Sequence, residues 1–154
     1  MLIENSNPRY TSSAMWWPSV VLAALGFVDA AYLTWIKLTG GAVACSNVGD
    51  CEVVNNSRFA VIGGVPIALL GAGTYLLILV LLGLERSNPA AGETTRMAVF
   101  GFSLVGTLYS AYLTYVELAI LKAICPYCVA SSIILTLLLA LSIIRLRQPW
   151  VEES

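Results

Sequence analysis

The stretch "CPYCVASSIILTLLLALSII", residues 125–144, decides which fold this chain can adopt. It carries no charged residue, and it matches the length of about 20 apolar residues that a helix needs to cross a lipid bilayer. Three further stretches are similar, so the windows expected to span are residues 17–38, 65–84, 97–121 and 124–144. With 58% hydrophobic and only 11% charged residues, the chain is more apolar than soluble domains usually are. We therefore predict four membrane-spanning helices.

The expected fold class is an all-α membrane protein. Unsatisfied backbone groups are costly in hydrocarbon, so each window should be a helix, and four helices with short connections pack as an antiparallel bundle. The four-helix membrane domain is expected over residues 15–147, between polar tails at residues 1–14 and 148–154. The longest polar connection, residues 39–64, is predicted to form an extracytoplasmic loop between the first and second helices.

The distribution of basic residues predicts how the helices are oriented, because cytoplasmic connections are enriched in Lys and Arg. Five arginines fall on the side that holds both termini, against three basic residues on the other side. The five are Arg9, Arg86, Arg96, Arg145 and Arg147, and the three are Lys37, Arg58 and Lys122. Both termini are therefore expected in the cytoplasm, and all four cysteines on the periplasmic or extracellular side, where disulfides persist. The net charge of −1 gives no reason to expect nucleic acid as a partner.

Residues 125–128 form a CxxC sequence, which is the spacing of many redox-active dithiols. Pro126 suits the first position of a helix, so Cys125 is predicted to lie near the N-cap and Cys128 within the first turn, on the same side. The positive end of the helix dipole stabilises a thiolate there. The two thiols are therefore candidates for a dithiol that opens and closes as a disulfide.

A second pair, Cys45 and Cys51, lies in the outer loop, and three interpretations of the two pairs remain open. One is a four-thiolate zinc site, but the five residues between Cys45 and Cys51 exceed the usual ligand spacing, so no metal is expected. Another is a pair of structural disulfides in a non-enzymatic membrane protein. The interpretation that we favour is a relay, in which the loop dithiol exchanges with the CxxC pair through a mixed disulfide.

A relay of this kind needs a terminal electron acceptor. The chain contains no histidine, no glycine-rich dinucleotide fingerprint and no haem-attachment sequence, which disfavours haem, nicotinamide and flavin. A lipid-soluble quinone remains, such as ubiquinone, menaquinone or phylloquinone. It would reach Cys128 from within the bilayer and bind between the helices, where the cofactor sites of bundles usually form.

These features together resemble the vitamin K epoxide reductase family, and in particular its bacterial quinone-linked members. The features are the four helices, the loop sequence "CSNVGDC", Ser57 after it, and "CPYC" opening the last helix. The resemblance implies that Cys51 accepts electrons from a reduced thioredoxin-like partner, and that Cys45 passes them to Cys125. It also implies that Cys128 reduces the quinone, with Ser57 beside the quinone or supporting the segment that covers it.

The function that the resemblance implies is disulfide formation, in which a partner dithiol and a quinone give a partner disulfide and a quinol. The protein is then expected in the bacterial inner membrane. Its thioredoxin-like partner is expected to be a separate protein, because the chain stops at Ser154. Ser131 and Ser132 stand where the animal members have a Thr-Tyr-Ala motif, so the resemblance does not imply reduction of vitamin K epoxide.

Two further residues are predicted to bind the quinone. Asp29 lies inside the first helix, where an ionisable group is costly and indicates a functional site. It is expected either to exchange a proton with the quinone or to hydrogen-bond Tyr109. Tyr127, between the reactive cysteines, is expected to hydrogen-bond a quinone carbonyl group.

A weak internal repeat relates "DAAYLTWIKL", residues 29–38, to "YSAYLTYVEL", residues 109–118. The two copies share Ala-Tyr-Leu-Thr, and each leads to the first cysteine of a pair. The repeat places Lys37 and Glu117 at matching depths in the bundle. The two side chains are therefore predicted to form a structural pair.

Overall fold

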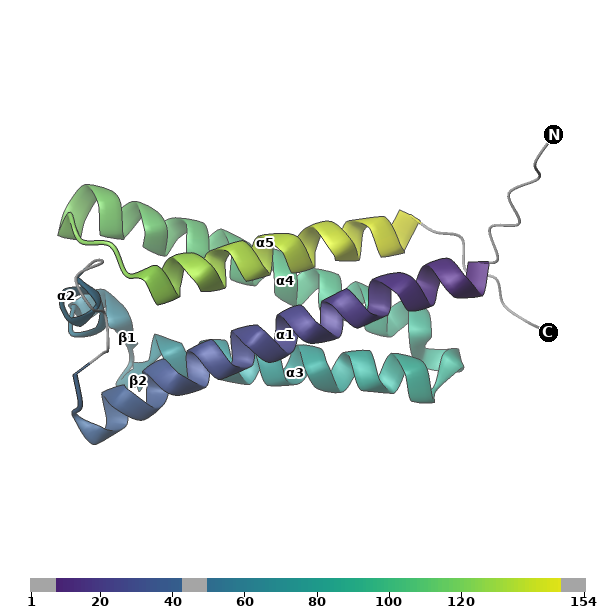
Figure 1. The fold of residues 1–154 in the computed structure, drawn as a ribbon, viewed down its shortest axis with the longest axis horizontal. Coiled ribbons are helices and arrows are strands. Elements are labelled where there is room, and N and C mark those ends of the chain that lie inside the picture. Colours follow the sequence, from purple (N-terminus) through teal and green to yellow (C-terminus); the bar gives the residue numbers. More distant parts are fainter. Residues whose placement is uncertain (1–7, 43–49, 148–154) are drawn as a thin grey trace.

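The computed structural model describes residues 8–42 and 50–147, which include four long helices (Figure 1). They are α1 (Pro8–Thr39), α3 (Ile67–Ser87), α4 (Gly92–Tyr115) and α5 (Pro126–Arg147). Each of these helices contains, or forms the first part of, a stretch that is long and apolar enough to cross a membrane. Contacts join α1 to α3, α3 to α4, α4 to α5 and α5 back to α1, so the helices form a closed bundle. The predicted all-α membrane fold is confirmed.

The helix ends differ from the predicted windows in three places. Helix α1 begins at Pro8, within the stretch expected to be a polar tail, although its membrane-spanning part starts at Ala14. The second helix begins later than predicted, because Val65–Pro66 belongs to a strand and Pro66 caps α3. Helix α4 gives way to a π-helical turn, η3 (Val116–Leu121), before the cysteines of the last helix.

A short segment between α1 and α3 covers one end of the bundle, at the left of Figure 1. It contains α2 (Cys51–Asn55), η1 (Arg58–Ala60), β1 (Val61–Ile62) and β2 (Val65–Pro66). The strands pair antiparallel, and Gly63 and Gly64 between them have φ angles of 56° and 86°, which suit a two-residue hairpin turn. We call this end the cysteine end, because Cys51, Cys125 and Cys128 lie there.

Large apolar side chains cover the outer surface of the bundle. Trp35, Leu76, Val105 and Ile133, one from each long helix, are all exposed. An extended apolar surface of this kind is not stable in water and marks contact with a membrane. The described helices thus place lipid-facing residues outside and a smaller core inside, as a multi-pass membrane protein requires.

Gly26 allows α1 and α3 to pack closely around Tyr75. A Cβ atom at position 26 would overlap the Tyr75 ring, so a larger residue has no room there. Tyr75 is 1% exposed, and its hydroxyl oxygen lies 2.7 Å from Oγ of Ser131 on α5. Tyr75 therefore contacts both α1 and α5 and joins three helices next to the cavity described below.

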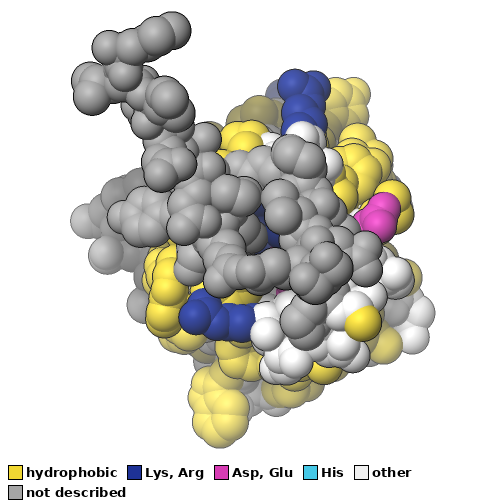
Figure 2. All heavy atoms as spheres, turned by 90° about the vertical axis from the view of Figure 1, so that its right-hand side faces the viewer, with side chains coloured by type: hydrophobic (Ala, Val, Ile, Leu, Met, Phe, Trp, Pro, Cys, Tyr) yellow, Lys and Arg dark blue, Asp and Glu magenta, His cyan; other side chains and the backbone are white. Residues whose placement is uncertain are grey.

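The opposite end of the bundle, where α1 begins and α5 ends, contains a buried ionic cluster. Glu85 of α3 pairs with Arg96 of α4, with 3.1 Å between Oε1 and Nε, and also with Arg145 of α5. All three side chains are buried, and Arg96 donates a further hydrogen bond to the Arg145 carbonyl oxygen. Figure 2 looks onto this end, where a few charged side chains are visible among hydrophobic ones. The cluster joins the ends of three helices, together with the connecting turn η2 (Pro89–Ala91).

Replacing Glu85 by alanine is expected to lower the free energy of unfolding by about 3–5 kcal/mol, because two buried arginines lose their carboxylate partner. Thermal unfolding of the purified protein in detergent measures the loss. Glu93→Ala is the matched control, since Glu93 is exposed in the first turn of α4 and its removal should cost less than about 0.5 kcal/mol. Equal stabilities of the two variants would show that the cluster does not hold the helices together.

Candidate functional site

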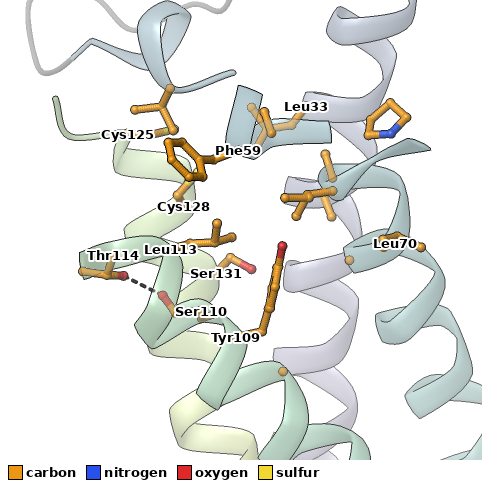
Figure 3. Close-up of a pocket in the computed structure, with 18 of the residues that line it drawn as sticks. Leu33, Phe59, Leu70, Tyr109, Ser110, Leu113, Thr114, Cys125, Cys128 and Ser131 are labelled. Atoms are coloured by element: carbon orange, nitrogen blue, oxygen red, sulfur yellow. Dashed lines mark hydrogen bonds between the residues drawn. The ribbon is translucent and has the colours of Figure 1, made fainter. Parts of the chain in front are cut away.

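A cavity of about 430 Å³ lies between the long helices at the cysteine end (Figure 3). Its wall is mostly apolar and includes Leu33 of α1, Leu70 of α3, Leu113 of α4 and Phe59 of η1. Cavities of roughly 300–1,000 Å³ with apolar walls and a few polar groups are typical of small-molecule sites. The polar groups on this wall therefore define the chemistry that the site can perform.

Cys125 and Cys128 lie on the wall of this cavity at the start of α5, and both are free thiols. The Cys125 carbonyl oxygen accepts a hydrogen bond from Val129 N–H at 3.1 Å, so α5 starts at Pro126 as the sequence predicts. Cys125 is buried and Cys128 is half-buried. A hydrogen bond from the Cys128 thiol lowers the pKa of Cys125 below its ordinary value, against the opposing effects of burial and of the Glu117 carboxylate. Cys125 is therefore the thiol of the pair that is more readily ionised.

Glu117 reaches the two cysteines because α4 ends in the π-helical turn η3. Just after this turn the Ala123 N–H donates to the Glu117 carbonyl oxygen at 3.0 Å, and the preceding residue, Lys122, adopts a left-handed φ of 52°. The Glu117 side chain is 3% exposed. Its Oε2 accepts a hydrogen bond from Cys125 N–H at 3.3 Å, and the carboxylate lies beside the Cys128 thiol. The wider turn thus places a carboxylate against both thiols.

The predicted pair between Lys37 and Glu117 is wrong. The Lys37 ammonium group donates instead to the carbonyl oxygen of Asn55 at 2.6 Å and to Oδ1 of Asn56 at 3.3 Å. Lys37 thereby fixes the end of α2 over α1. The repeat misled the prediction because its two copies differ in structure: the first remains α-helical to Thr39, whereas the second becomes π-helical and turns Glu117 inward.

The segment from α2 to β2, which we call the covering segment, brings a third cysteine close to Cys125 and Cys128. We call these two cysteines the inner pair. Cys51 is disulfide-bonded and 1% exposed, and it packs in one buried cluster with Cys125, Val54 and Ala123. The Asp50 N–H donates to the carbonyl oxygen of Ile124 at 3.0 Å, which fixes α2 beside the start of α5. The predicted catalytic residues Cys51, Cys125 and Cys128 therefore lie together, while Cys45 falls outside the described residues.

Ser57 and Asp29, predicted to bind the quinone, both lie on the cavity wall. The Ser57 hydroxyl donates to the carbonyl oxygen of Val54 at 2.7 Å, so its oxygen can still accept a hydrogen bond. Oδ2 of Asp29 is buried and has no hydrogen-bond partner in the part of the chain that the structure describes. The alternative bond from Asp29 to Tyr109 is not formed between these described residues, although Tyr109 also lies on the wall.

Tyr127 is not among the residues that line the cavity, and its contact with the quinone stays a prediction. It precedes Cys128 on α5, so its side chain points about 100° away around the helix axis. Its ring packs instead against Tyr32 of α1, with 5.4 Å between the ring centroids. Tyr127 also packs against the buried cluster that contains Val54 and Cys125, and both of these residues line the cavity.

Sequence reasoning missed the position of Glu117. The rule that an ionisable residue inside a spanning helix indicates a functional site applies to Glu117 as much as to Asp29. Glu117 also precedes Cys125 by eight residues along the chain, which places it next to the motif. What the sequence does not reveal is the π-helical turn that points this side chain inward.

Comparisons with known proteins identify the family of this chain. Residues 17–143 match the Vitamin K epoxide reductase family. The chain is also 32% identical over 128 residues to the thiol-disulfide oxidoreductase LTO1 of Arabidopsis thaliana, a match that covers 75% of this chain and 32% of that protein. The chain therefore spans about a third of the length of this curated relative.

Proposed function

Because this chain belongs to the vitamin K epoxide reductase family, we propose that it oxidises the dithiol of a partner protein and passes the electrons to a membrane quinone. One observation supports this function above the others. A free dithiol, Cys125 and Cys128, lies on the wall of an apolar cavity between membrane-spanning helices, beside the disulfide-bonded Cys51. A lipid-soluble acceptor can approach such a cavity through the bilayer, while a protein partner can approach the segment that covers it.

The two cysteine pairs act in sequence in this proposal. The partner's thiolate attacks Cys51, and exchange leaves the partner oxidised and Cys45 and Cys51 as thiols. Cys45 then attacks Cys125 of an inner disulfide, and completion of the exchange leaves Cys125 and Cys128 as thiols. These two thiols form their disulfide again when two electrons leave them for the quinone. The net reaction converts partner dithiol and quinone into partner disulfide and quinol.

The residues of the cavity fit a quinone. Leu33, Phe59 and Leu70 offer apolar contacts to a ring, and a quinone supplies an acceptor for two electrons and two protons. We assign Cys128, Ser57 and Asp29 to the quinone site. The buried Oδ2 of Asp29, which lacks a partner within the described residues, gains one if the protonated side chain donates to a carbonyl oxygen of the quinone. Ubiquinone, menaquinone and phylloquinone share the ring and apolar tail that this cavity requires.

The cysteine end is proposed to face the periplasm from a bacterial inner membrane, with both termini in the cytoplasm. The positive-inside rule supports this orientation, since Arg86, Arg96, Arg145 and Arg147 lie at the opposite end of the bundle. An oxidising compartment also suits the disulfide at Cys51. The expected partner is a thioredoxin-like protein, whose reactive dithiol is exposed.

The proposed function is tested by supplying the purified protein in detergent with dithiothreitol and one of the three quinones. We expect dithiol-dependent loss of quinone absorbance that saturates with quinone concentration. If no quinone is reduced and all four cysteines stay paired in the presence of dithiothreitol, the protein would instead be a membrane protein stapled by two structural disulfides.

A further inference from the structure

The Glu117 carboxylate contacts both thiol-bearing residues of the inner pair. It accepts a hydrogen bond from Cys125 N–H, at 3.3 Å, it lies beside the Cys128 thiol, and its side chain is 3% exposed. Among the described residues, no lysine or arginine forms an ion pair with it. A buried carboxylate without a cation is costly. Such a residue inside a spanning segment therefore indicates a function.

The backbone departs from α-helical geometry twice to hold this carboxylate in place. The turn Val116–Leu121 is π-helical, and Lys122 after it has a left-handed φ of 52°. π-helical turns are rare and occur frequently at functional sites, and a left-handed conformation is unfavourable for a residue with a side chain. Two unfavourable features in succession are retained where they deliver a side chain to a site.

Proton transfer is the chemistry that this position allows. Formation of the inner disulfide removes protons from two thiols, and reduction of a quinone consumes two protons. A side chain that moves one of them must contact a thiol and face the cavity, and Glu117 does both. The chain has no histidine to serve instead, and carboxylic groups act as general acids and bases in other enzymes.

We propose that Glu117 is the catalytic acid and base of the inner dithiol. This inference rests on the proposed quinone-linked function. As the disulfide between Cys125 and Cys128 forms, the carboxylate accepts the proton of the Cys128 thiol and then gives it to one quinone oxygen. Cys125 enters this step as a thiolate, and Asp29 supplies the second proton of the quinol. The two sulfurs lose two electrons, the quinone gains them, and protons from water restore Asp29.

The test replaces Glu117 by glutamine, which keeps the size of the side chain and an oxygen acceptor for Cys125 N–H but cannot take up the thiol proton. With dithiothreitol as donor, quinone reduction by E117Q is expected to fall about 100-fold or more. Alkylation of the inner thiols by iodoacetamide, measured without quinone, is expected to become faster, because loss of a neighbouring negative charge favours thiolates. A purely structural role does not predict these opposite changes, and a purely electrostatic role predicts the faster alkylation but no loss of quinone reduction.

Two further variants complete the experiment. Glu117→Asp retains a carboxylate and is expected to reduce quinone faster than E117Q. Glu52→Gln is the matched control, because Glu52 is an exposed acid on α2 whose loss should leave turnover with dithiothreitol unchanged. Native turnover by E117Q, or slower alkylation of its inner thiols, would overturn the role of Glu117 alone. Failure of the native protein to reduce any quinone would instead overturn the proposed function together with this inference.

Discussion

Cys128→Ser is expected to reduce quinone no faster than the uncatalysed background, even when dithiothreitol supplies the electrons. Cys128 is the half-buried thiol on the cavity wall, and without its sulfur the inner pair cannot form the disulfide that releases two electrons. Cys125→Ser is expected to fail in the same way, because it removes the other half of that disulfide. The absorbance of the quinone, followed with the purified variants in detergent, measures both losses.

Thr136→Ala provides the matched control for this experiment. Thr136 lies on the same helix as Cys128, is exposed, and hydrogen-bonds only the Ser132 carbonyl oxygen among the described residues. Its removal is expected to leave quinone reduction at the native rate. A Cys128→Ser protein that reduced quinone as fast as this control would exclude Cys128 as the residue that delivers electrons.

Cys51→Ser is expected to lose oxidation of a reduced thioredoxin-like protein while it keeps quinone reduction with dithiothreitol. Cys51 lies in the covering segment and packs against Cys125, so it stands between a protein partner and the inner pair. A small dithiol can reach the inner pair through the cavity and does not need Cys51. The measurement compares the two electron donors on one preparation, so that any loss of folded protein affects both rates equally. Cys45→Ser is expected to show the same dependence on the donor.

The result that would contradict this role of Cys51 is an equal loss of activity with both donors, in proportion to the loss of folded protein. That outcome would mean that the disulfide at Cys51 only holds the covering segment in place. Together with an inactive native protein, it would favour the interpretation of two structural disulfides. Retained oxidation of the protein partner by Cys51→Ser would contradict the relay in a different way, since the partner would then reach the inner pair directly.

The four spanning helices could be predicted from the sequence because length and apolar composition alone determine them in a bilayer. The start of the last helix was equally clear, since Pro126 marks its first position and places the thiols in its first turn. The cavity wall was predicted in part, because Asp29 and Ser57 do lie on it. These features depend on the local order of apolar, polar and proline residues, which a single sequence contains.

The position of Glu117 and the neighbour of Tyr127 depend instead on helix phase, which for Glu117 a single π-helical turn changes. The insertion at Val116–Leu121 rotates Glu117 toward the thiols and breaks its expected pairing with Lys37. Tyr127 was assigned to the site because it stands between two cysteines in sequence, yet the helix directs its ring toward Tyr32. Neither the site of a π-helical turn nor the neighbour of a given helix face can be read from residue types alone.

A single-turnover titration tests most directly whether electrons pass from the inner thiols to a quinone. The protein is reduced, freed of reductant and mixed with excess quinone without oxygen, and the thiols lost and quinol formed are both counted. We predict that the native chain, with four cysteines, loses all its thiols and forms one quinol for every two of them. Cys51→Ser should lose only the inner two. Quinol formed without loss of thiols, or thiols lost without quinol, would contradict the account.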